Sequence, residues 1–215
     1  MTRTKNIPRI VRWAVMTCVV MLLGACSHSR AASSIQPAAA GYVTLDPSLK
    51  RLQNDFNADA DKVRLLYIVG GTCPVCLRGM DDLGKALSAQ QNDPHLQTFI
   101  VYVPALGAKA TDIRPTVYLL PGKYVSRYWD PSGTSGRLFD ETLHTGGFAW
   151  DVWMIYGAGQ RWDGTKPPVP DFWMDQLGPP LPQWRYLDAG TFNKQVERYL
   201  ARIRTAPASS LVDAP

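Results

Sequence analysis

Two cysteines of this 215-residue chain have the type and spacing that redox or metal chemistry needs. Cys73 and Cys76 are separated only by Pro74 and Val75, while the other two of the four cysteines lie near the N-terminus. A pair at this spacing is typical of thiol–disulfide exchange or of metal binding. A purely structural bridge is disfavoured, because closing so short a loop restrains the unfolded chain very little.

The segments around the pair predict a strand before it and a helix after it. Val63 to Val69 is a near-continuous apolar run, typical of a central strand that is covered on both faces. Apolar residues then recur at helical spacing, at Leu77, Met80, Leu83 and Leu87. Leu96 to Val103 is a second apolar strand, so the unit is strand, cysteine pair, helix and strand.

This placement predicts different roles for the two sulfurs. Cys73 is expected at or next to the N-cap of the helix and next to solvent, where unpaired backbone N–H groups and the helix dipole favour a thiolate. Cys76 lies inside the first turn and is more shielded. We therefore predict that Cys73 attacks a disulfide and that Cys76 resolves the mixed disulfide. Pro74 suits the first helical turn, where its missing N–H would have no intrahelical partner.

The flanking sequence predicts further elements before and after this unit. Tyr42 to Leu45 is a short first strand, and Asp46 with Pro47 is the N-cap and first-turn proline of a helix. Residues 104–128 are interrupted by prolines, which predicts mixed structure. Gly136 to Leu143 is a short helix.

The last third of the chain predicts a hairpin and a terminal helix. Val152 to Tyr156 is strand-like, and the glycines that follow predict a tight reversal into Gln160 to Trp162. Residues 163–171 form a proline-rich loop. Apolar residues between Phe192 and Ile203 recur at helical spacing and predict a helix that starts at Asp188 or Thr191.

The chain resembles the thioredoxin superfamily over most of residues 42–204. The resemblance is carried by the strand at 63–69, the motif Cys73-Pro74-Val75-Cys76, the helix behind it, and the later hairpin with its terminal helix. The resemblance implies an α/β, thioredoxin-like fold, with a central mixed β-sheet flanked by helices and a proline-rich insertion before the C-terminal helix. It also implies a thiol-disulfide oxidoreductase that needs no cofactor, with Cys73 and Cys76 as its catalytic residues.

Two positions depart from the pattern of that family. Its cis-proline, which faces the CxxC motif, has its matching place in residues 148–150, where no proline stands. Its buried carboxylate, six residues before the first cysteine, is replaced by Tyr67. We expect Ala149, Trp150 and Asp151 beside the pair, with Asp151 either an aid to proton transfer or a turn or cap residue.

The N-terminal stretch has the three parts of an export signal. Four basic residues precede an apolar run from Trp13 to Leu23, which is too short to span a bilayer. The sequence Leu23-Gly24-Ala25-Cys26 resembles the bacterial lipobox, which implies that Cys26 is lipidated after cleavage. Ser27, the next residue, favours the outer membrane.

These patterns divide the chain into a lipoprotein signal peptide at 1–25, a flexible tether at 26–41 that starts from lipidated Cys26, a thioredoxin-like domain at 42–204 and a disordered tail at 205–215. The domain is expected on the periplasmic side of the envelope, with protein thiols or disulfides as partners. The formal charge of +5 does not predict a nucleic-acid partner. The signal carries four of the 23 basic residues and no acid, which leaves 19 basic against 18 acidic residues.

Two other functions fit the same cysteine pair. One is a two-thiolate copper(I) site; structural zinc is disfavoured, because His28 and His95 are expected in solvated segments and His144 alone remains as a further donor. The other is an interaction module of an envelope, secretion or conjugation assembly with little turnover. A group of late aromatic residues is expected to pack rather than to bind a sugar or peptide: Trp150, Trp153, Trp162, Phe172, Trp173 and Trp184.

Overall fold

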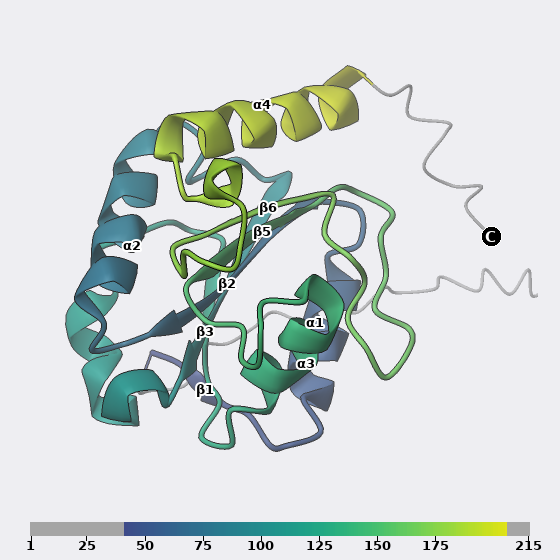
Figure 1. Ribbon diagram of the computed structural model, residues 1–215. Coiled ribbons are helices and arrows are strands. Elements are labelled where there is room, and N and C mark those ends of the chain that lie inside the picture. The colour runs from purple at the N-terminus through teal and green to yellow at the C-terminus, as the bar shows by residue number, and fades with distance from the viewer. Residues whose placement is uncertain (1–40, 206–215) are drawn as a thin grey trace, which may run out of the picture. The chain divides into compact units, whose positions relative to one another are not determined.

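The computed structural model describes residues 41–205, which form a six-stranded mixed β-sheet between two layers of helices (Figure 1). The strand order is β1-β4-β3-β2-β5-β6. The first four in this order are parallel, β5 is antiparallel to β2, and β6 is antiparallel to β5. The strands are β1 (Val43–Thr44), β2 (Val63–Gly70), β3 (Leu96–Val103), β4 (Val125–Trp129), β5 (Val152–Tyr156) and β6 (Phe172–Asp175).

Four α-helices within the described residues cover the sheet. They are α1 (Lys50–Ala58), α2 (Pro74–Ala86), α3 (Thr134–Leu143) and α4 (Ala189–Thr205). Helices α2 and α4 lie on the face of β2 that carries Tyr67, and α1 and α3 lie on the face that carries Leu66 and Ile68. Because β2 is buried on both faces, it has no solvent-facing side, which explains why its residues are apolar except for Arg64.

Two units of this sheet confirm the predicted thioredoxin-like fold. The first is the parallel strand–helix–strand unit of β2, α2 and β3, registered from Val63 opposite Leu96 to Gly70 opposite Val103. The second is the antiparallel pair of β5 and β6, followed by α4. The proline-rich insertion lies between β5 and α4, on both sides of β6.

The predicted bounds of β3 and β5 are confirmed, and β2 is one residue longer than predicted. The stretch at 104–128 contains three short 3-10 helices (Ala105–Gly107, Ala110–Asp112 and Arg114–Thr116) and then enters β4, a strand that the sequence pattern did not reveal. The predicted N-cap at Asp46 is wrong. Asp46 accepts the N–H of Ser48 at 2.8 Å in a turn, and α1 begins only after Leu49, which has a positive φ of 54°.

The predicted strand at Gln160 to Trp162 is also wrong, because β5 pairs with β6 and the loop at 157–171 leaves the sheet. The N–H of Trp162 donates to Asn57 of α1 at 2.7 Å, and its carbonyl accepts from Asn57 and Gln53. Side chains of α1 thus satisfy the backbone that a partner strand would otherwise satisfy.

Arg64 joins β2 to the same loop. Its fully buried guanidinium donates to the carbonyls of Gly157 and Gln160, each at 2.6 Å, and lies 4.4 Å from the ring centroid of Phe56. Burial lowers the pKa of Arg64 to about 10. The group therefore stays charged at neutral pH and holds the loop through charge-assisted hydrogen bonds.

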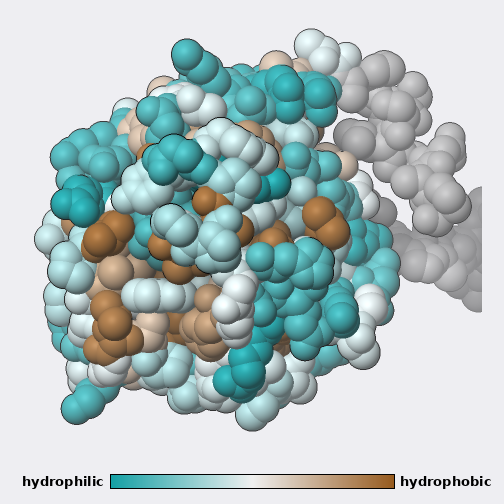
Figure 2. All heavy atoms as spheres, in the orientation of Figure 1, coloured by the Kyte–Doolittle hydropathy of each residue, from teal (hydrophilic) through white to brown (hydrophobic). Residues whose placement is uncertain are grey.

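Residues 1–40 and 206–215, which contain the predicted signal peptide and nearly all of the predicted tether and tail, lie outside the described residues. None of the helices between residues 41 and 205 combines the length and the hydropathy that a bilayer crossing requires. Figure 2 shows hydrophobic side chains in small patches between hydrophilic ones on one face. The large apolar side chains that are exposed are Leu106, Tyr118, Val169, Trp184 and Tyr186.

Candidate functional site

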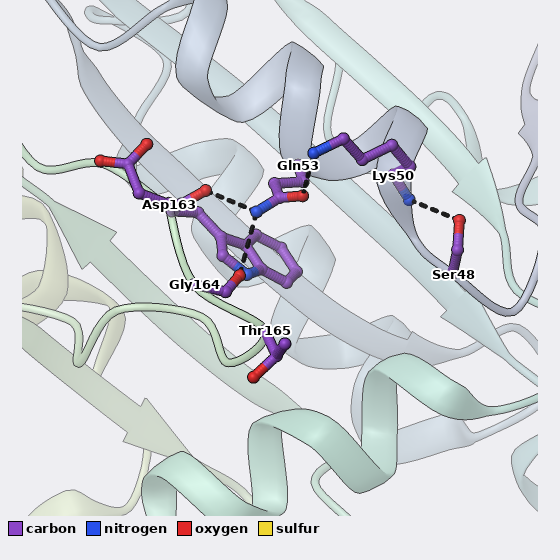
Figure 3. A pocket seen from close by; sticks show the side chains of 7 residues that line it. Ser48, Lys50, Gln53, Asp163, Gly164 and Thr165 are labelled. Atoms are coloured by element: carbon purple, nitrogen blue, oxygen red, sulfur yellow. Dashed lines mark hydrogen bonds between the residues drawn. The ribbon is translucent and has the colours of Figure 1, made fainter.

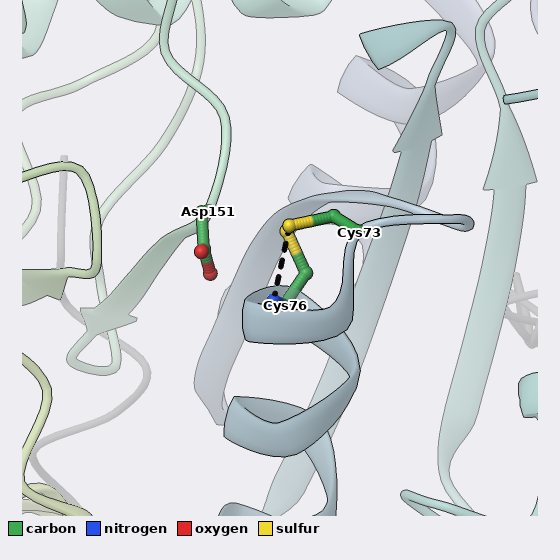
Figure 4. Close-up of side chains that lie close together, drawn as sticks. All are labelled: Cys73, Cys76 and Asp151. Atoms are coloured by element: carbon green, nitrogen blue, oxygen red, sulfur yellow. Dashed lines mark hydrogen bonds between the residues drawn. The ribbon is translucent and has the colours of Figure 1, made fainter. Parts of the chain in front are cut away.

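The cysteine pair stands where β2 gives way to α2, at the carboxyl end of the parallel strands. Cys73 is the N-cap of α2, with φ −78° and ψ 115°, and Pro74 is the first helical residue. The N–H of Cys76 donates to Cys73 Sγ at 3.3 Å (Figure 4). The sulfur therefore takes the place that a serine or aspartate oxygen takes at many helix starts. The predicted N-cap position is confirmed, and both thiols are free.

Both cysteines are buried, with 4% of Cys73 and none of Cys76 exposed. The expectation that Cys73 lies next to solvent is wrong, because its side chain belongs to the buried hydrophobic cluster beneath α2 and α4. Burial raises the pKa of the Cys76 thiol far above its ordinary value, and the nearby carboxyl of Asp151 raises it further. Cys76 is therefore protonated at neutral pH, in agreement with its expected shielding.

Asp151 is the third polar side chain of this site (Figure 4). It lies directly before β5 and is 3% exposed. One of its carboxyl oxygens and the two cysteine sulfurs all lie within 4.8 Å of one another. Burial raises the pKa of Asp151 to about 6, against weaker opposing effects of the neighbouring Cys76 thiol and Trp153 indole. A carboxyl group with this pKa takes up and gives up a proton close to neutral pH.

The sequence left two roles open for Asp151, and the structure favours one of them. A turn or cap residue uses its oxygens on backbone N–H groups. Asp151 Oδ1 is buried and has no hydrogen-bond partner. The side chain therefore does not serve as a cap through this oxygen, and it places a carboxyl group beside the cysteines.

The segment before β5 takes the place of the family's cis-proline. Within residues 41–205 the one cis peptide bond precedes Pro180, far along the chain from this segment. Trp150 is half-buried and packs against the hydrophobic clusters on both faces of the sheet. Ala149 is buried in the cluster beneath α1 and α3 and donates its N–H to the Gly136 carbonyl. The structure therefore brings Asp151 to the side of the cysteines, places Trp150 at the boundary of the two clusters, and does not bring Ala149 to the pair.

Tyr67 occupies the position where the family has its buried carboxylate. Its side chain is fully buried, its ring centroid lies 4.8 Å from that of Trp153, and its hydroxyl has no hydrogen-bond partner. Burial raises the pKa of Tyr67 well above its ordinary value, so the phenol stays neutral. The acidic group beside Cys76 thus comes from the entrance to β5 instead of from β2.

Cys73, Cys76 and Asp151 also form the one group within residues 41–205 whose donor atoms are close enough together for a metal ion. Three donors are one short of the four that structural zinc takes. His95, before β3, and His144, the C-cap of α3, are exposed and stand outside this group. His28 lies outside the described residues.

Most of the late aromatic residues pack in the protein, as predicted. Trp153, Trp162 and Trp173 are buried, and Phe172 and Trp150 are half-buried against the cores. Trp184 differs, since it is 66% exposed. The guanidinium of Arg185 lies 3.9 Å from the ring centroid of Trp173 and 4.4 Å from that of Trp184, which holds the exposed indole against the fold.

A shallow polar pocket lies on the α1 side of the sheet (Figure 3). It is lined by Ser48, Lys50, Gln53, Trp162, Asp163, Gly164 and Thr165. Gln53 Nε2 donates to the carbonyls of Trp162 and Gly164, at 2.6 and 3.1 Å. The central polar group of this pocket thus serves to fasten the loop to α1, and α1 covers the face opposite the helix that carries the cysteines.

No protein-family model and no curated protein matches the sequence. Among solved structures, a thiol:disulfide interchange protein of the thioredoxin family from Chlorobium tepidum TLS is 12% identical, with 67% of this chain and 84% of that chain covered at a TM-score of 0.45. A SCO1/SenC family lipoprotein from Bacillus anthracis str. Ames is 10% identical, with 69% and 85% covered at a TM-score of 0.44. A secreted Mycobacterium tuberculosis disulfide oxidoreductase is 13% identical, with 64% and 82% covered at a TM-score of 0.38. Such distant likeness carries no conclusion about chemistry, which depends on the site itself.

Proposed function

We propose that this protein is a thiol-disulfide oxidoreductase that acts through Cys73 and Cys76. The observation that carries the proposal is the placement of the pair. Cys73 Sγ accepts the N–H of Cys76 at the start of α2, so the helix terminus that favours negative charge points at this sulfur. Cys76 is fully buried one turn inside. The two thiols therefore have the asymmetry that a two-step exchange requires.

The exchange proceeds through a mixed disulfide. The Cys73 thiolate attacks one sulfur of a client disulfide, and the other client sulfur leaves as a thiolate. Cys76 then attacks Cys73 Sγ, which releases the second client sulfur as a thiolate and leaves a Cys73–Cys76 disulfide. The client gains two electrons, the pair loses two, and the reverse sequence oxidises a client dithiol.

The setting of this reaction is part of the proposal. The N-terminal pattern supports export, lipid attachment at Cys26 and a place on the periplasmic side of the envelope, with Ser27 favouring the outer membrane. Such an oxidising compartment does not keep thiols reduced, so a cysteine pair there is expected to form a disulfide or to exchange with partners. Client proteins with thiols or disulfides are the expected partners.

Trapping of clients tests the proposed function. Cys76→Ser leaves Cys73 able to attack but removes the resolving thiol, so client complexes should accumulate and disappear under reductant. Cys73→Ser is the matched control and should trap few clients, because burial raises the pKa of the remaining Cys76 thiol and leaves little thiolate. Equal trapping by the two variants would contradict the assigned roles. If neither variant traps a client, the result favours the copper(I)-site or interaction-module alternative over thiol exchange.

A further inference from the structure

The contacts of the buried Asp151 carboxyl do not indicate a role in stabilising the fold. Its Oδ1 lies in the protein without a hydrogen-bond partner, and buried polar atoms without partners are rare in folded proteins. One carboxyl oxygen lies within 4.8 Å of both cysteine sulfurs. The side chain therefore lies at a place where its burial destabilises the fold and where the two cysteine sulfurs are close to its carboxyl group.

The backbone fixes Asp151 at that place. Val152, the next residue, is paired with Ile68 of β2 on one side and with Asp175 of β6 on the other. The carbonyl of Asp151 accepts the N–H of Gln176 at 3.0 Å. The residue has a positive φ of 54°, a conformation that aspartate and asparagine adopt more readily than other residues with a side chain. Asparagine is thus a variant that keeps both the shape and the backbone conformation.

The groups that face Asp151 come from two elements, α2 and β6. Cys73 and Cys76 lie at the start of α2, Arg78 is on the next turn of that helix, and Asp175 is at the end of β6. Asp175 opposes the ionisation of Asp151, while the neighbouring Cys76 thiol and Arg78 favour it. Burial outweighs them and raises the pKa of Asp151 to about 6.

Cys76 needs a group that takes its proton. Its pKa is raised by burial, so few molecules hold the thiolate that must attack Cys73 Sγ. The strand that carries Tyr67 offers a neutral phenol and no carboxylate. Among the described side chains that surround the pair, Asp151 is the acidic group whose oxygen lies beside the sulfur of Cys76.

We propose that Asp151 is the general base that takes the proton from Cys76 Sγ while this sulfur attacks Cys73 Sγ, and the general acid that returns it in the reverse direction. The inference rests on the proposed thiol exchange and names a third catalytic residue for it. In the resolving step the S–H bond of Cys76 breaks, its proton moves to Asp151, the Cys73–Cys76 bond forms, and the client sulfur leaves with its electron pair. In the reverse step a client thiolate attacks Cys73 Sγ and Cys76 leaves with the proton of Asp151.

A purely electrostatic role for Asp151 predicts the opposite effect of removing its charge. The negative carboxylate raises the pKa of Cys76. Asp151→Asn would therefore lower that pKa, increase the fraction of Cys76 thiolate and speed resolution. Loss of a general base slows resolution instead, typically by about 100-fold or more. The direction of the change separates the two roles.

The test uses the full chain with Cys18 and Cys26 replaced by serine, so that every reacting thiol belongs to the pair. The reduced protein is mixed with 5,5′-dithiobis(2-nitrobenzoate) in a stopped-flow instrument. The first coloured thiolate released reports attack on the probe, and the second reports resolution of the mixed disulfide. At pH 7, Asp151→Asn should slow the second release by about 100-fold or more and change the first by less than about twofold. In the parent the second rate should rise through about pH 6, and this rise should be lost in the variant.

Asp82→Asn is the matched control, because it removes one negative charge from the exposed side of α2 and should leave both releases unchanged. A second release that is equally fast or faster in Asp151→Asn overturns the inference while leaving the proposed function intact. Absence of the first release overturns the proposed function itself. If Asp151→Asn does not fold, the parent alone decides, since a second rate without an inflection near pH 6 also overturns the inference.

Discussion

Replacing Asp151 with asparagine should remove a pH dependence from the free energy of unfolding. The folded-state pKa of Asp151 is about 6, against an ordinary value of 3.8 for an exposed aspartate. A difference of about two pH units corresponds to about 3 kcal/mol. The folded protein holds this proton more tightly than the unfolded chain. The resulting stabilisation is complete below about pH 4 and is lost as the pH rises through about 6.

The measurement is urea unfolding followed by tryptophan fluorescence at pH values from 4 to 7, with both thiols kept reduced. The difference in unfolding free energy between Asp151→Asn and the parent should grow in favour of the variant by about 3 kcal/mol over this range. Any constant effect of the new amide cancels, since only the change of the difference with pH is used. Asp82→Asn, at an exposed site, should follow the parent within about 0.5 kcal/mol at every pH.

A difference that stays constant from pH 4 to pH 7 would refute the reasoning. It would mean that the Asp151 carboxyl ionises in the folded protein as easily as in the unfolded chain. Burial without a hydrogen-bond partner for Oδ1 would then have no energetic consequence, and the carboxyl would be an unsuitable proton acceptor near neutral pH.

Three further substitutions test other parts of the structure. Gly84→Ala should lower the unfolding free energy by about 2 kcal/mol in urea titrations, because a Cβ there would overlap the Leu119 carbonyl oxygen; Gly190→Ala, with no close contact, is the control and should not destabilise. Arg64→Met should cost about 3 kcal/mol and increase amide exchange in the loop at 157–171, since the carbonyls of Gly157 and Gln160 lose their donors. Cys26→Ser should abolish labelling by radioactive fatty acid in growing cells, and a variant that still carried the label would exclude lipid attachment at Cys26.

The elements that the sequence predicted well are those whose residues alone decide their structure. β2 and β3 are buried on both faces, so each appears as an apolar run that ends where the strand ends. The start of α2 was predicted from Cys73 and Pro74, because an N-cap followed by proline is a local signal. No long-range information is needed for either.

The elements that were missed depend on partners far along the chain. Trp162 was predicted to be a strand residue, but Asn57 and Gln53 of α1 bind its backbone. A local sequence pattern does not predict such a contact. β4 is a five-residue strand after a proline-rich stretch and becomes visible only through its pairing with β3. For Asp151, a place beside the pair was expected from the resemblance, whereas its burial there could not be, because burial depends on how α2 packs against β5.

The register between β2 and β5 bears on which changes of length this protein can accept. Val152 opposite Ile68 sets the place of Asp151, and a slip by one residue would turn its side chain to the other face of the sheet. The loop at 157–171 follows β5, and its bonds to Arg64 of β2 and to Asn57 of α1 involve residues 157–162, ahead of the segment at 164–169. Residues inserted in or deleted from 164–169 should leave the three reacting groups in place, whereas one residue inserted between Asp151 and Tyr156 should separate them. A library of homologous or engineered chains would thus be free to vary this loop while the length of β5 stays constant.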